Sequence, residues 1–254
     1  ALAHKAYEVI NTVYRDFEEG RDIDVQTKDD TTPASNADRK TEQELRNLIK
    51  QHYPDHGILG EEYGSENLDT EYVWVLDPVD GTREFLAKKP GHFGTLIGLL
   101  RNGKPYTGII ADPLEQTIYG EALGSKPDRR KITIEQAHLA CTNIDTMFSD
   151  SPYYKNAQDL QNRSAEFSSE LNCMGFARCA EGNIDAVFEA DLSLHDVAGL
   201  LPVLFDNHCA VIDFDGKSYQ DITFDLGHAG DKKFNVIAAR NLDLAENILA
   251  ELKT

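Results

Sequence analysis

The sequence predicts a chain in two parts, an α+β N-terminal half with an antiparallel sheet and an α/β C-terminal half. Two amphipathic helical patterns stand near the start, and apolar runs separated by Asn-Gly and Asp-Pro turns follow them. Further along, strand-like runs alternate with helical ones. A polar, charged segment at 124–136 separates the two patterns, so we predict domains at 1–130 and 131–254.

Two helices are predicted before the first strand. Residues 2–17 place their apolar side chains on one helical stripe. Residues 20–38 are polar and show no helical period, so they are predicted to form a loop. Ser35 offers an N-cap for a second helix at 36–53, which places Asp38 in the first turn of that helix.

The strands of the first half are read from short apolar runs. The run at 56–64 is a short strand that leads into two glutamates. The run at 72–76 is apolar on both faces, which is typical of a central strand. Residues 92–123 alternate apolar runs with turn residues, as in an antiparallel meander.

The second half follows a different pattern. Residues 176–190 predict a helix end, a glycine and a strand. Residues 196–217 predict a helix followed by a strand and a turn, and residues 233–253 predict a strand and a closing helix. This alternation favours an α/β architecture.

Composition excludes several classes of partner. The formal net charge of -19 argues against nucleic acid, whose phosphates need a basic surface. No apolar stretch approaches the roughly 18 residues that a membrane helix requires. The four cysteines form no Cys-x-x-Cys pair, and the N-terminal residues show no signal-peptide pattern, so a cytoplasmic protein with reduced thiols is expected. An anionic substrate would need local cations, and metal ions are the obvious candidates.

Acidic residues stand at the ends of several predicted elements. They are Asp38, Glu61, Asp77, Asp80 and Asp196. Side chains at the ends of separate elements can converge on one point. Carboxylates that converge repel one another and become protonated unless cations neutralise them, and Mg²⁺ prefers such oxygen ligands. Singly, an Asp-Gly pair is a turn and an Asp at a helix start is an N-cap. The combination favours a metal site.

The stretch 77–82, Asp-Pro-Val-Asp-Gly-Thr, has a spacing that suits this chemistry. Pro78 stiffens a predicted turn and leaves the two carboxylates and the Val79 carbonyl free to point together. Gly81 permits an unusual backbone conformation and the close approach of a ligand. If Gly81 and Thr82 begin a helix, their amides can receive a phosphate oxygen.

Three motifs together resemble the signatures of the inositol monophosphatase superfamily. They are "GEE" at 60–62, "WVLDPVDGTREF" at 74–85 and "HDVAG" at 195–199, in the expected order and spacing over nearly the whole chain. The resemblance implies an αβαβα layered sandwich and a Mg²⁺-dependent, lithium-sensitive phosphomonoesterase that acts on a small phosphorylated metabolite. Dimers are common in the family, so a homodimer is expected by analogy.

The resemblance also implies a set of metal ligands. Glu61, Asp77 and the Val79 carbonyl match the ligands of a first metal ion, and Asp77, Asp80 and Asp196 match those of a second. A third, weaker ion in the family is bound by Glu61 and waters, so Glu61 is expected to be a catalytic residue as well as a metal ligand. Two to three Mg²⁺ ions per site are therefore expected.

The remaining roles follow in the same way. Asp38 and Thr82 resemble the pair that orients and activates the nucleophilic water. Glu189 matches a position that often contacts the alcohol part of the substrate, and Arg178 is a further candidate for specificity. The substrate contacts expected are Asp80, Gly81, Thr82, Arg178 and Glu189.

Two stretches resemble the histidinol-phosphate phosphatase branch, namely "PGHFGTLIGLL" at 90–100 and "GLLPVL" at 199–204. Pro202 costs about 3 kcal/mol in an ordinary helix interior, so it is interpreted as an inherited feature. His195 replaces the aromatic residue usual before the last metal ligand, and is interpreted as a packing or hydrogen-bonding substitute. Residues 168–182 lack the Gly-Gly-Asp stretch of that branch and faintly resemble bisphosphate nucleotidases.

Histidinol phosphate is therefore the substrate predicted. Inositol 1-phosphate and 3′(2′),5′-bisphosphate nucleotides are the alternatives. A protein of a different class would keep the metal site and only sense metal or phosphometabolites. The intact pair of Asp38 and Thr82 argues against it, because a binding protein has no need to activate water.

Overall fold

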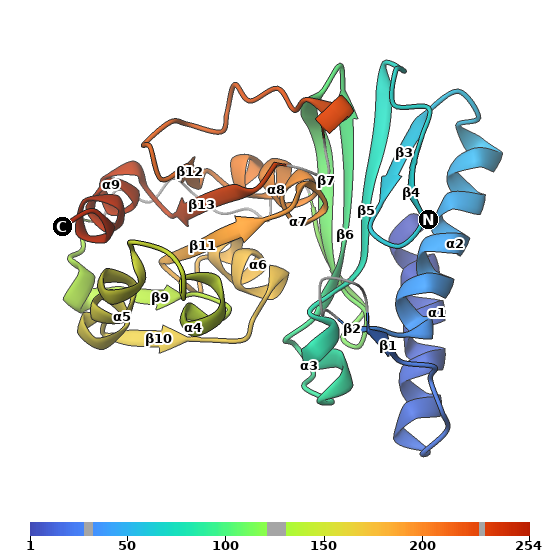
Figure 1. Cartoon of the computed structure of the whole chain (residues 1–254), viewed down its shortest axis with the longest axis horizontal. Helices are drawn as coiled ribbons and strands as arrows, with labels where there is room; N and C mark the ends of the chain where they lie inside the picture. The colour runs from blue at the N-terminus through green and yellow to red at the C-terminus, as the bar shows by residue number, and fades with distance from the viewer. Residues whose placement is uncertain (28–32, 121–130, 229–231) are drawn as a thin grey trace.

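The computed structural model describes residues 1–27, 33–120, 131–228 and 232–254. Helices and two sheets alternate in five layers, in the order α-β-α-β-α (Figure 1). This is the layered sandwich that the family resemblance implied. None of the described helices is long and apolar enough to cross a membrane.

The first two layers come from the N-terminal half. The outer helices are α1 (Leu2–Glu18) and α2 (Asn36–His52). They cover a six-stranded sheet of order β4-β3-β5-β6-β7-β8 (Figure 1). Its strands are β3 (Gly57–Gly60), β4 (Gly64–Glu66), β5 (Tyr72–Asp80), β6 (Gly94–Arg101), β7 (Lys104–Asp112) and β8 (Thr117–Tyr119). The short helix α3 (Thr82–Leu86) follows β5, and a two-stranded ladder pairs β1 (Gln26–Thr27) with β2 (Pro33–Ala34).

The other three layers come from the C-terminal half. The middle layer holds α6 (Cys173–Glu181), α7 (Leu194–Ala198) and α8 (Leu200–Asp206). The second sheet has the order β10-β9-β11-β13-β12 and is mixed. Its strands are β9 (His138–Ala140), β10 (Glu166–Ser168), β11 (Ala186–Leu192), β12 (Ala210–Ile212) and β13 (Phe234–Ala239). The last layer holds α4 (Ile144–Met147), α5 (Tyr154–Arg163) and α9 (Leu242–Leu252). Two 3-10 turns, η1 (Ile134–Gln136) and η2 (Leu226–His228), precede β9 and β13 in the chain.

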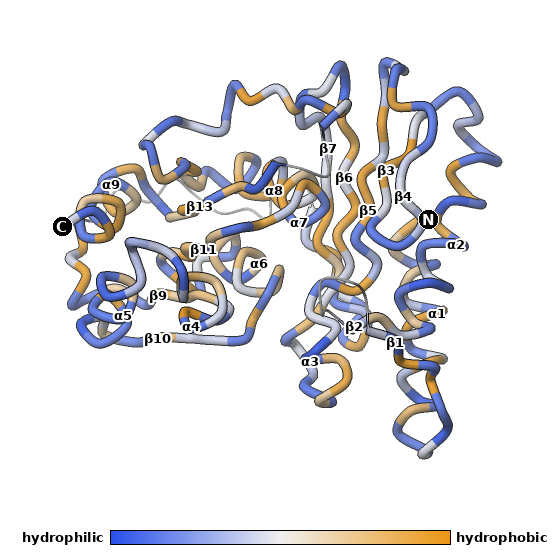
Figure 2. The backbone as a smooth tube through the Cα atoms, in the orientation of Figure 1, coloured by the Kyte–Doolittle hydropathy of each residue, from blue (hydrophilic) through white to orange (hydrophobic). Residues whose placement is uncertain are grey.

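Both sheets are buried on both faces, which explains why their strands are apolar runs. Leu96 and Leu100 of β6 pack toward the middle helices, whereas Ile97 packs toward α1 and α2. In β11, Val187 faces the middle layer and Phe188 faces the outer one. Successive side chains of a strand point to opposite faces, so a strand between two helical layers needs apolar residues at every position. Figure 2 shows the apolar colour concentrated along these strands.

The elements predicted in the first half are present, with two corrections. The helices predicted at 2–17 and 36–53 are α1 and α2, and Ser35 caps α2 as predicted. The segment 20–38 is not loop throughout, because it contains the β1–β2 ladder. The first sheet is not purely antiparallel, because β3 pairs in parallel with β5.

The second half needs one correction that concerns a proline. The single helix predicted from Asp196 is divided at Gly199 into α7 and α8. Pro202 is the third residue of α8 and lies in its first turn, where a missing N–H breaks no helical hydrogen bond. The cost expected for a proline in a helix interior therefore does not apply.

Two parts of the sequence lie beyond the predicted elements. No element was predicted over residues 137–172, where β9, α4, α5 and β10 lie. Of the segment 124–136, residues 124–130 lie outside the described residues, and η1 occupies the end. The division into domains at 1–130 and 131–254 stays a prediction.

Candidate metal centre

The strand β5 carries two carboxylates past the point where the sequence predicts its end. Asp77 pairs with Leu96 of β6 and Asp80 pairs with Gly94, so three steps along β5 match two along β6. This is a β-bulge. Residues three apart in a regular strand point to opposite faces, and the extra residue of the bulge lets them point to the same side. The turn predicted at Pro78 is therefore wrong, because the strand continues through the bulge.

The third carboxylate, that of Asp196, belongs to helix α7 in the middle layer. Ser193 caps α7, and its backbone N–H and its hydroxyl both donate to Asp196 Oδ2 at 2.6 Å. The junction of α7 and α8 lies directly on the first sheet. A Cβ atom on Gly108 of β7 would lie 2.2 Å from the carbonyl oxygen of Gly199, so only glycine allows this approach.

The result is a cluster of three carboxylates at the end of β5. One oxygen atom from each of Asp77, Asp80 and Asp196 lies within 4.8 Å of the others. Within the described part of the chain, no other three His, Cys, Asp or Glu residues come together in this way. The sequence grouped these residues because each stands at the end of a predicted element and because the family resemblance implies a shared metal ion, and the structure brings their side chains together.

Glu61 joins the cluster from the neighbouring strand. It follows β3, and its backbone N–H donates to the carbonyl of Leu76 at 3.2 Å, one residue before Asp77. Its charge contributes to the shifted pKa of Asp77. Glu61 also lines the same cavity as the three aspartates.

The pKa values of Asp77 and Asp80 show that the cluster lacks a compensating positive charge. Burial raises the pKa of Asp77 well above its usual range, and the charges of Glu61, Asp80 and Asp196 raise it further. Burial and the charge of Asp196 raise the pKa of Asp80 to about 7, although the backbone N–H of Cys173 donates to Asp80 Oδ2. Without a cation, burial and the neighbouring carboxylates therefore favour the protonated forms of Asp77 and Asp80.

The donor set fits a hard divalent cation. Asp77 is 2% exposed, and its Oδ1 atom has no hydrogen-bond partner among the described residues. Buried carboxylate oxygens are normally hydrogen-bonded, so an oxygen without a partner on a member of this cluster indicates a metal ligand. Oxygen-only ligands of this kind suit Mg²⁺ better than the softer metals.

Beside the cluster lies the pair of Asp38 and Thr82. Asp38 is the third residue of α2, and its Oδ2 accepts hydrogen bonds from the N–H and the hydroxyl of Ser35, both at 2.7 Å. Thr82 Oγ1 lies 3.0 Å from Asp38 Oδ1 and 3.0 Å from the Val79 carbonyl oxygen. Burial raises the pKa of Asp38, while the hydrogen bonds of Ser35 and Thr82 lower it.

Gly81 connects the bulge to α3. Its φ of 91° lies in the left-handed region, and a Cβ atom there would lie 2.6 Å from Asn172 Nδ2. A side chain is thus excluded by backbone strain and by space together. Glycine keeps the backbone of residues 81 and 82 accessible at the cavity, as the sequence predicted for the start of a helix.

A cavity of about 510 Å³ joins these groups. Seven predicted site residues line it: Glu61, Asp77, Val79, Asp80, Gly81, Thr82 and Asp196. Asp38 lies behind Thr82 and does not line it. The sequence did not single out the rest of the wall, which is Pro33, Arg83, Glu84, Ala87, Lys89, Thr142, Asn143, Thr146, Met147, Glu170 and Asn172.

Two predicted substrate contacts also lie outside the lining. Arg178 Nη2 donates to the carbonyl of Gly91 at 3.0 Å. Glu189 is 1% exposed and accepts hydrogen bonds from the N–H of Thr142 at 2.7 Å and from its hydroxyl at 2.8 Å. Burial raises the pKa of Glu189 to about 8. Glu189 thus supports Thr142, which does line the cavity, and both assignments stay predictions.

The loop before α6 forms the part of the cavity wall next to Asp80, whose Oδ2 accepts a hydrogen bond from the N–H of Cys173. Lys89 Nζ lies 2.5 Å from Glu170 Oε2, and Asn172 Nδ2 donates to Glu84 Oε2 at 2.9 Å. Glu170 and Asn172 have φ values of 58° and 49°, so two non-glycine residues stand in the left-handed region. Strain of this kind clusters at ligand sites. The sequence singled out the stretch 168–182 but not Glu170 or Asn172 within it, since they are single polar side chains in an irregular loop.

His195 precedes the last aspartate of the cluster. Its Nδ1 atom is buried and has no hydrogen-bond partner among the described residues. The cluster of three carboxylates does not include it. Its role as a packing or hydrogen-bonding substitute stays a prediction.

Comparisons with known proteins agree with this arrangement. A model of the Inositol monophosphatase family matches residues 1–254. The bifunctional phosphatase IMPL2, chloroplastic, of Arabidopsis thaliana is 31% identical over 264 residues, which cover 100% of this chain and 73% of that protein. The histidinol-phosphatase of Mycobacterium tuberculosis is 27% identical over 191 residues, or 70% of this chain and 73% of that one.

Solved structures show the same fold. An inositol monophosphatase from Zymomonas mobilis is 26% identical, with a TM-score of 0.76, over 100% of this chain and 96% of that one. The extragenic suppressor protein suhB from Bartonella henselae has a TM-score of 0.81 at 22% identity, over 99% of this chain and 96% of that one.

Proposed function

The chain belongs to the inositol monophosphatase family, whose members are metal-dependent phosphoric monoester hydrolases, and on this premise we propose that it hydrolyses a small phosphorylated alcohol with Mg²⁺. The observation that carries the proposal is the orphan Oδ1 atom of buried Asp77 beside Asp80 and Asp196. Burial and neighbouring charges disfavour the charged forms of Asp77 and Asp80, and a bound divalent cation would relieve this repulsion.

Two to three Mg²⁺ ions are proposed per site. Glu61, Asp77 and the Val79 carbonyl would hold the first, and Asp77, Asp80 and Asp196 would hold the second. The bulge in β5 supports this assignment, because it turns the carboxylates of residues 77 and 80 to one side. When bound, Mg²⁺ neutralises phosphate charge, lowers the pKa of water and stabilises the leaving alkoxide.

Asp38 and Thr82 are proposed to orient the attacking water and accept its proton. Their 3.0 Å contact places a carboxylate behind a hydroxyl that faces the cavity. Burial makes Asp38 a stronger base than a solvated aspartate. The backbone amides of Gly81 and Thr82 are proposed to hold the phosphate beside Asp80. Attack by water needs no covalent intermediate.

Histidinol phosphate is the substrate proposed. Relatives of this chain are named histidinol-phosphatase, among them the mycobacterial one. The wall of the cavity supports the same choice. Glu84 and Glu170 bring two carboxylates to it, and Glu84 is bonded to a neutral amide of Asn172. A substrate whose alcohol part carries an ammonium group is favoured next to such a carboxylate. Glu189, behind Thr142, and Arg178 are proposed to tune this end of the site.

Inositol 1-phosphate is the second candidate, because relatives of this chain include proteins named inositol-1-monophosphatase. A 3′(2′),5′-bisphosphate nucleotide is the third, from the resemblance of residues 168–182. A silent metal-binding protein is disfavoured by the contact of Asp38 with Thr82.

Phosphate release from these three substrates, with Mg²⁺, with chelator and with lithium, tests the proposal. We expect Mg²⁺-dependent turnover that chelator abolishes and lithium inhibits, fastest with histidinol phosphate. No turnover of any substrate would reject the hydrolase for these substrates. A preference of about tenfold for inositol 1-phosphate, or 1.4 kcal/mol in the barrier, would reject the histidinol assignment alone.

Three further points are proposed. A homodimer is proposed from the family. A cytoplasmic location is proposed because all four cysteines are buried and free. The division into domains at 1–130 and 131–254 is proposed because each half contributes one of the two sheets. Size-exclusion chromatography with light scattering checks the first of these points.

A further inference from the structure

The helix α2 carries a second buried carboxylate one turn beyond Asp38. Glu42 is 0% exposed. Residues four apart on a helix lie on the same face, so Glu42 and Asp38 face the first sheet together. A fully buried carboxylate is costly unless its oxygens are paired. The partners of Glu42 therefore indicate its role.

Glu42 binds the connection between β3 and β4. Its Oε2 accepts a hydrogen bond from the backbone N–H of Glu62 at 2.7 Å, and its Oε1 accepts one from the N–H of Tyr63 at 3.1 Å. The residue immediately before these two is Glu61, whose own N–H donates to the carbonyl of Leu76 in β5 at 3.2 Å. The backbone around Glu61 is thus fixed to a strand on one side and to Glu42 on the other.

Gly60 shows how closely the carboxylate approaches this connection. A Cβ atom on Gly60 would lie 2.0 Å from Glu42 Oε1 and 2.7 Å from Oε2. The space beside Gly60 is therefore filled by the Glu42 carboxylate. The "GEE" motif begins with glycine here because a side chain would displace Glu42.

A buried arginine neutralises Glu42. Arg46 is 5% exposed, and its Nε donates to Glu42 Oε1 at 2.8 Å. Its Nη1 donates to Glu66 Oε1 in β4 at 2.8 Å, and its Nη2 donates to the carbonyl of Gly64. Glu42 thus binds the start of the β3–β4 connection to α2, and Arg46 binds strand β4 to it.

We propose that Glu42 is a positioning residue for the metal site, which fixes the backbone of Glu61 relative to Asp38. Asp38 and Glu42 are one turn apart on α2, so a single helix sets the place of both the proposed base and a proposed metal ligand. The inference rests on the proposed role of Glu61. Groups that orient metal ligands typically contribute about 10- to 100-fold to metal affinity.

The test is Mg²⁺ binding by titration calorimetry of metal-free protein, which does not depend on turnover. In Glu42→Gln, an NH₂ group replaces one acceptor and faces donors from Arg46 or the hairpin. We expect Mg²⁺ affinity to fall about 10- to 100-fold. Glu66→Gln is the matched control, because it changes one contact of Arg46 and leaves the hydrogen bonds that Glu42 accepts from the β3–β4 connection. Its affinity should stay within about twofold of wild type.

Gly60→Ala tests the same claim without changing Glu42 itself, because the added methyl group must displace the Glu42 carboxylate. It serves if Glu42→Gln fails to fold, as judged by circular dichroism. We expect a comparable loss of Mg²⁺ affinity. The inference would be overturned if folded Glu42→Gln bound Mg²⁺ with wild-type affinity. If Glu42→Gln is unfolded, the same result in folded Gly60→Ala would overturn it. Absence of Mg²⁺ binding by the wild-type protein would instead overturn the proposed function.

Discussion

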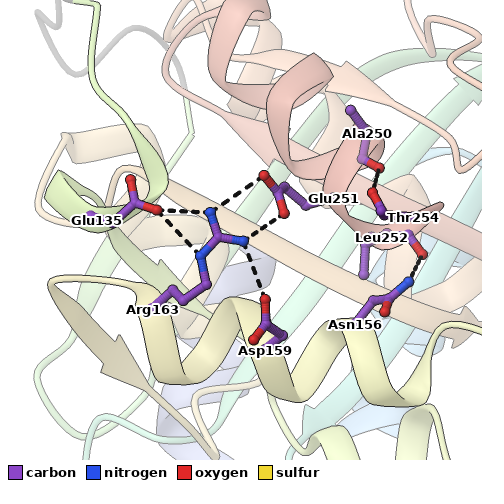
Figure 3. A network of polar contacts seen from close by, with 8 residues as sticks. All are labelled: Glu135, Asn156, Asp159, Arg163, Ala250, Glu251, Leu252 and Thr254. Atoms are coloured by element: carbon purple, nitrogen blue, oxygen red, sulfur yellow. Dashed lines mark hydrogen bonds and ion pairs between the residues drawn. The ribbon is translucent and has the colours of Figure 1, made fainter.

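Two groups of carboxylates in this protein have opposite environments. In the outer layer, Arg163 of α5 bonds to Glu135, Asp159 and Glu251 (Figure 3). Hydrogen bonds from Arg163 lower the pKa of Glu135 to about 2. At the end of β5, burial and neighbouring carboxylates raise the pKa of Asp80 to about 7.

The difference teaches how to separate a structural cluster from a functional one. Three acids gather at each place, so composition does not distinguish them. The acids around Arg163 are satisfied by a cation that the chain supplies. The leading causes of the shifts at Asp77 and Asp80 are burial and other carboxylates. An acidic cluster that the chain leaves uncompensated indicates an external cation.

The largest effect is expected from Asp80→Asn. Loss of a metal-ligating carboxylate removes several kcal/mol of transition-state stabilisation, so turnover should fall at least about 10³-fold while the fold stays intact. Phosphate release and circular dichroism check this. Glu135→Gln is the control and should retain full activity. Retained activity in Asp80→Asn would mean that the metal assignment is wrong.

The pH dependence of the metal-free protein should also separate the two groups. Aspartate has an ordinary pKa near 3.8, and in folded protein the pKa of Asp80 is about 7. Between these values the folded state holds a proton that the unfolded state releases, so stability from this group is lost as pH rises. We expect Tm to fall from pH 5 to pH 8, and saturating Mg²⁺ to restore it more at pH 8 than at pH 5. A metal-free Tm that rises over this range in the wild type and matches Asp80→Asn would contradict the account.

The Glu189 carboxyl group should also make the folded protein less stable as pH rises, by a smaller amount than Asp80, and Glu189→Gln tests this. At pH 7 the carboxyl group of Glu189 holds its proton, because its pKa is about 8, so glutamine is a close substitute. We expect stability at pH 6 to change by less than about 1 kcal/mol, and the loss of stability between pH 6 and pH 9 to shrink. Urea unfolding at the two pH values measures this. A variant that is strongly destabilised at pH 6 would show that Glu189 is charged there.

Arg163→Gln should have the smallest effect. The network is partly exposed, and ion pairs of this kind contribute little. We expect a decrease in Tm of no more than about 4 °C, and unchanged Mg²⁺ affinity and turnover. Thermal unfolding and titration calorimetry check it. A loss of Mg²⁺ affinity would contradict the claim that the acids around Arg163 have no part in metal binding.

The sequence predicted the residues of the site better than the shape that brings them together. Asp77 and Asp80 were recognised because an apolar run stops beside them. The bulge was missed because it depends on pairing with Leu96 and Gly94, which lie in another strand. Gly60 appeared only as part of a motif, and its reason is the approach of Glu42 from α2.

The part of the cavity wall that Lys89, Glu170 and Asn172 form could not be predicted from the sequence, for a different reason. Lys89, Glu170 and Asn172 come from two loops of irregular conformation, so no period or spacing marks them. The fold class could be predicted, since both sheets lie between helical layers and their central strands, such as β6 and β11, are almost entirely buried. Pro202 was misplaced because the break at Gly199 follows from packing against β7.

The central claim is that a cation binds where the chain leaves its carboxylates uncompensated. Its most direct test is a crystal structure with Mn²⁺, located by anomalous scattering. We expect a peak between Asp77, Asp80 and Asp196, and none beside Glu135, Asp159 and Glu251. A crystal soaked in Mn²⁺ with no peak at the first cluster, or with one only at the second, would contradict the account.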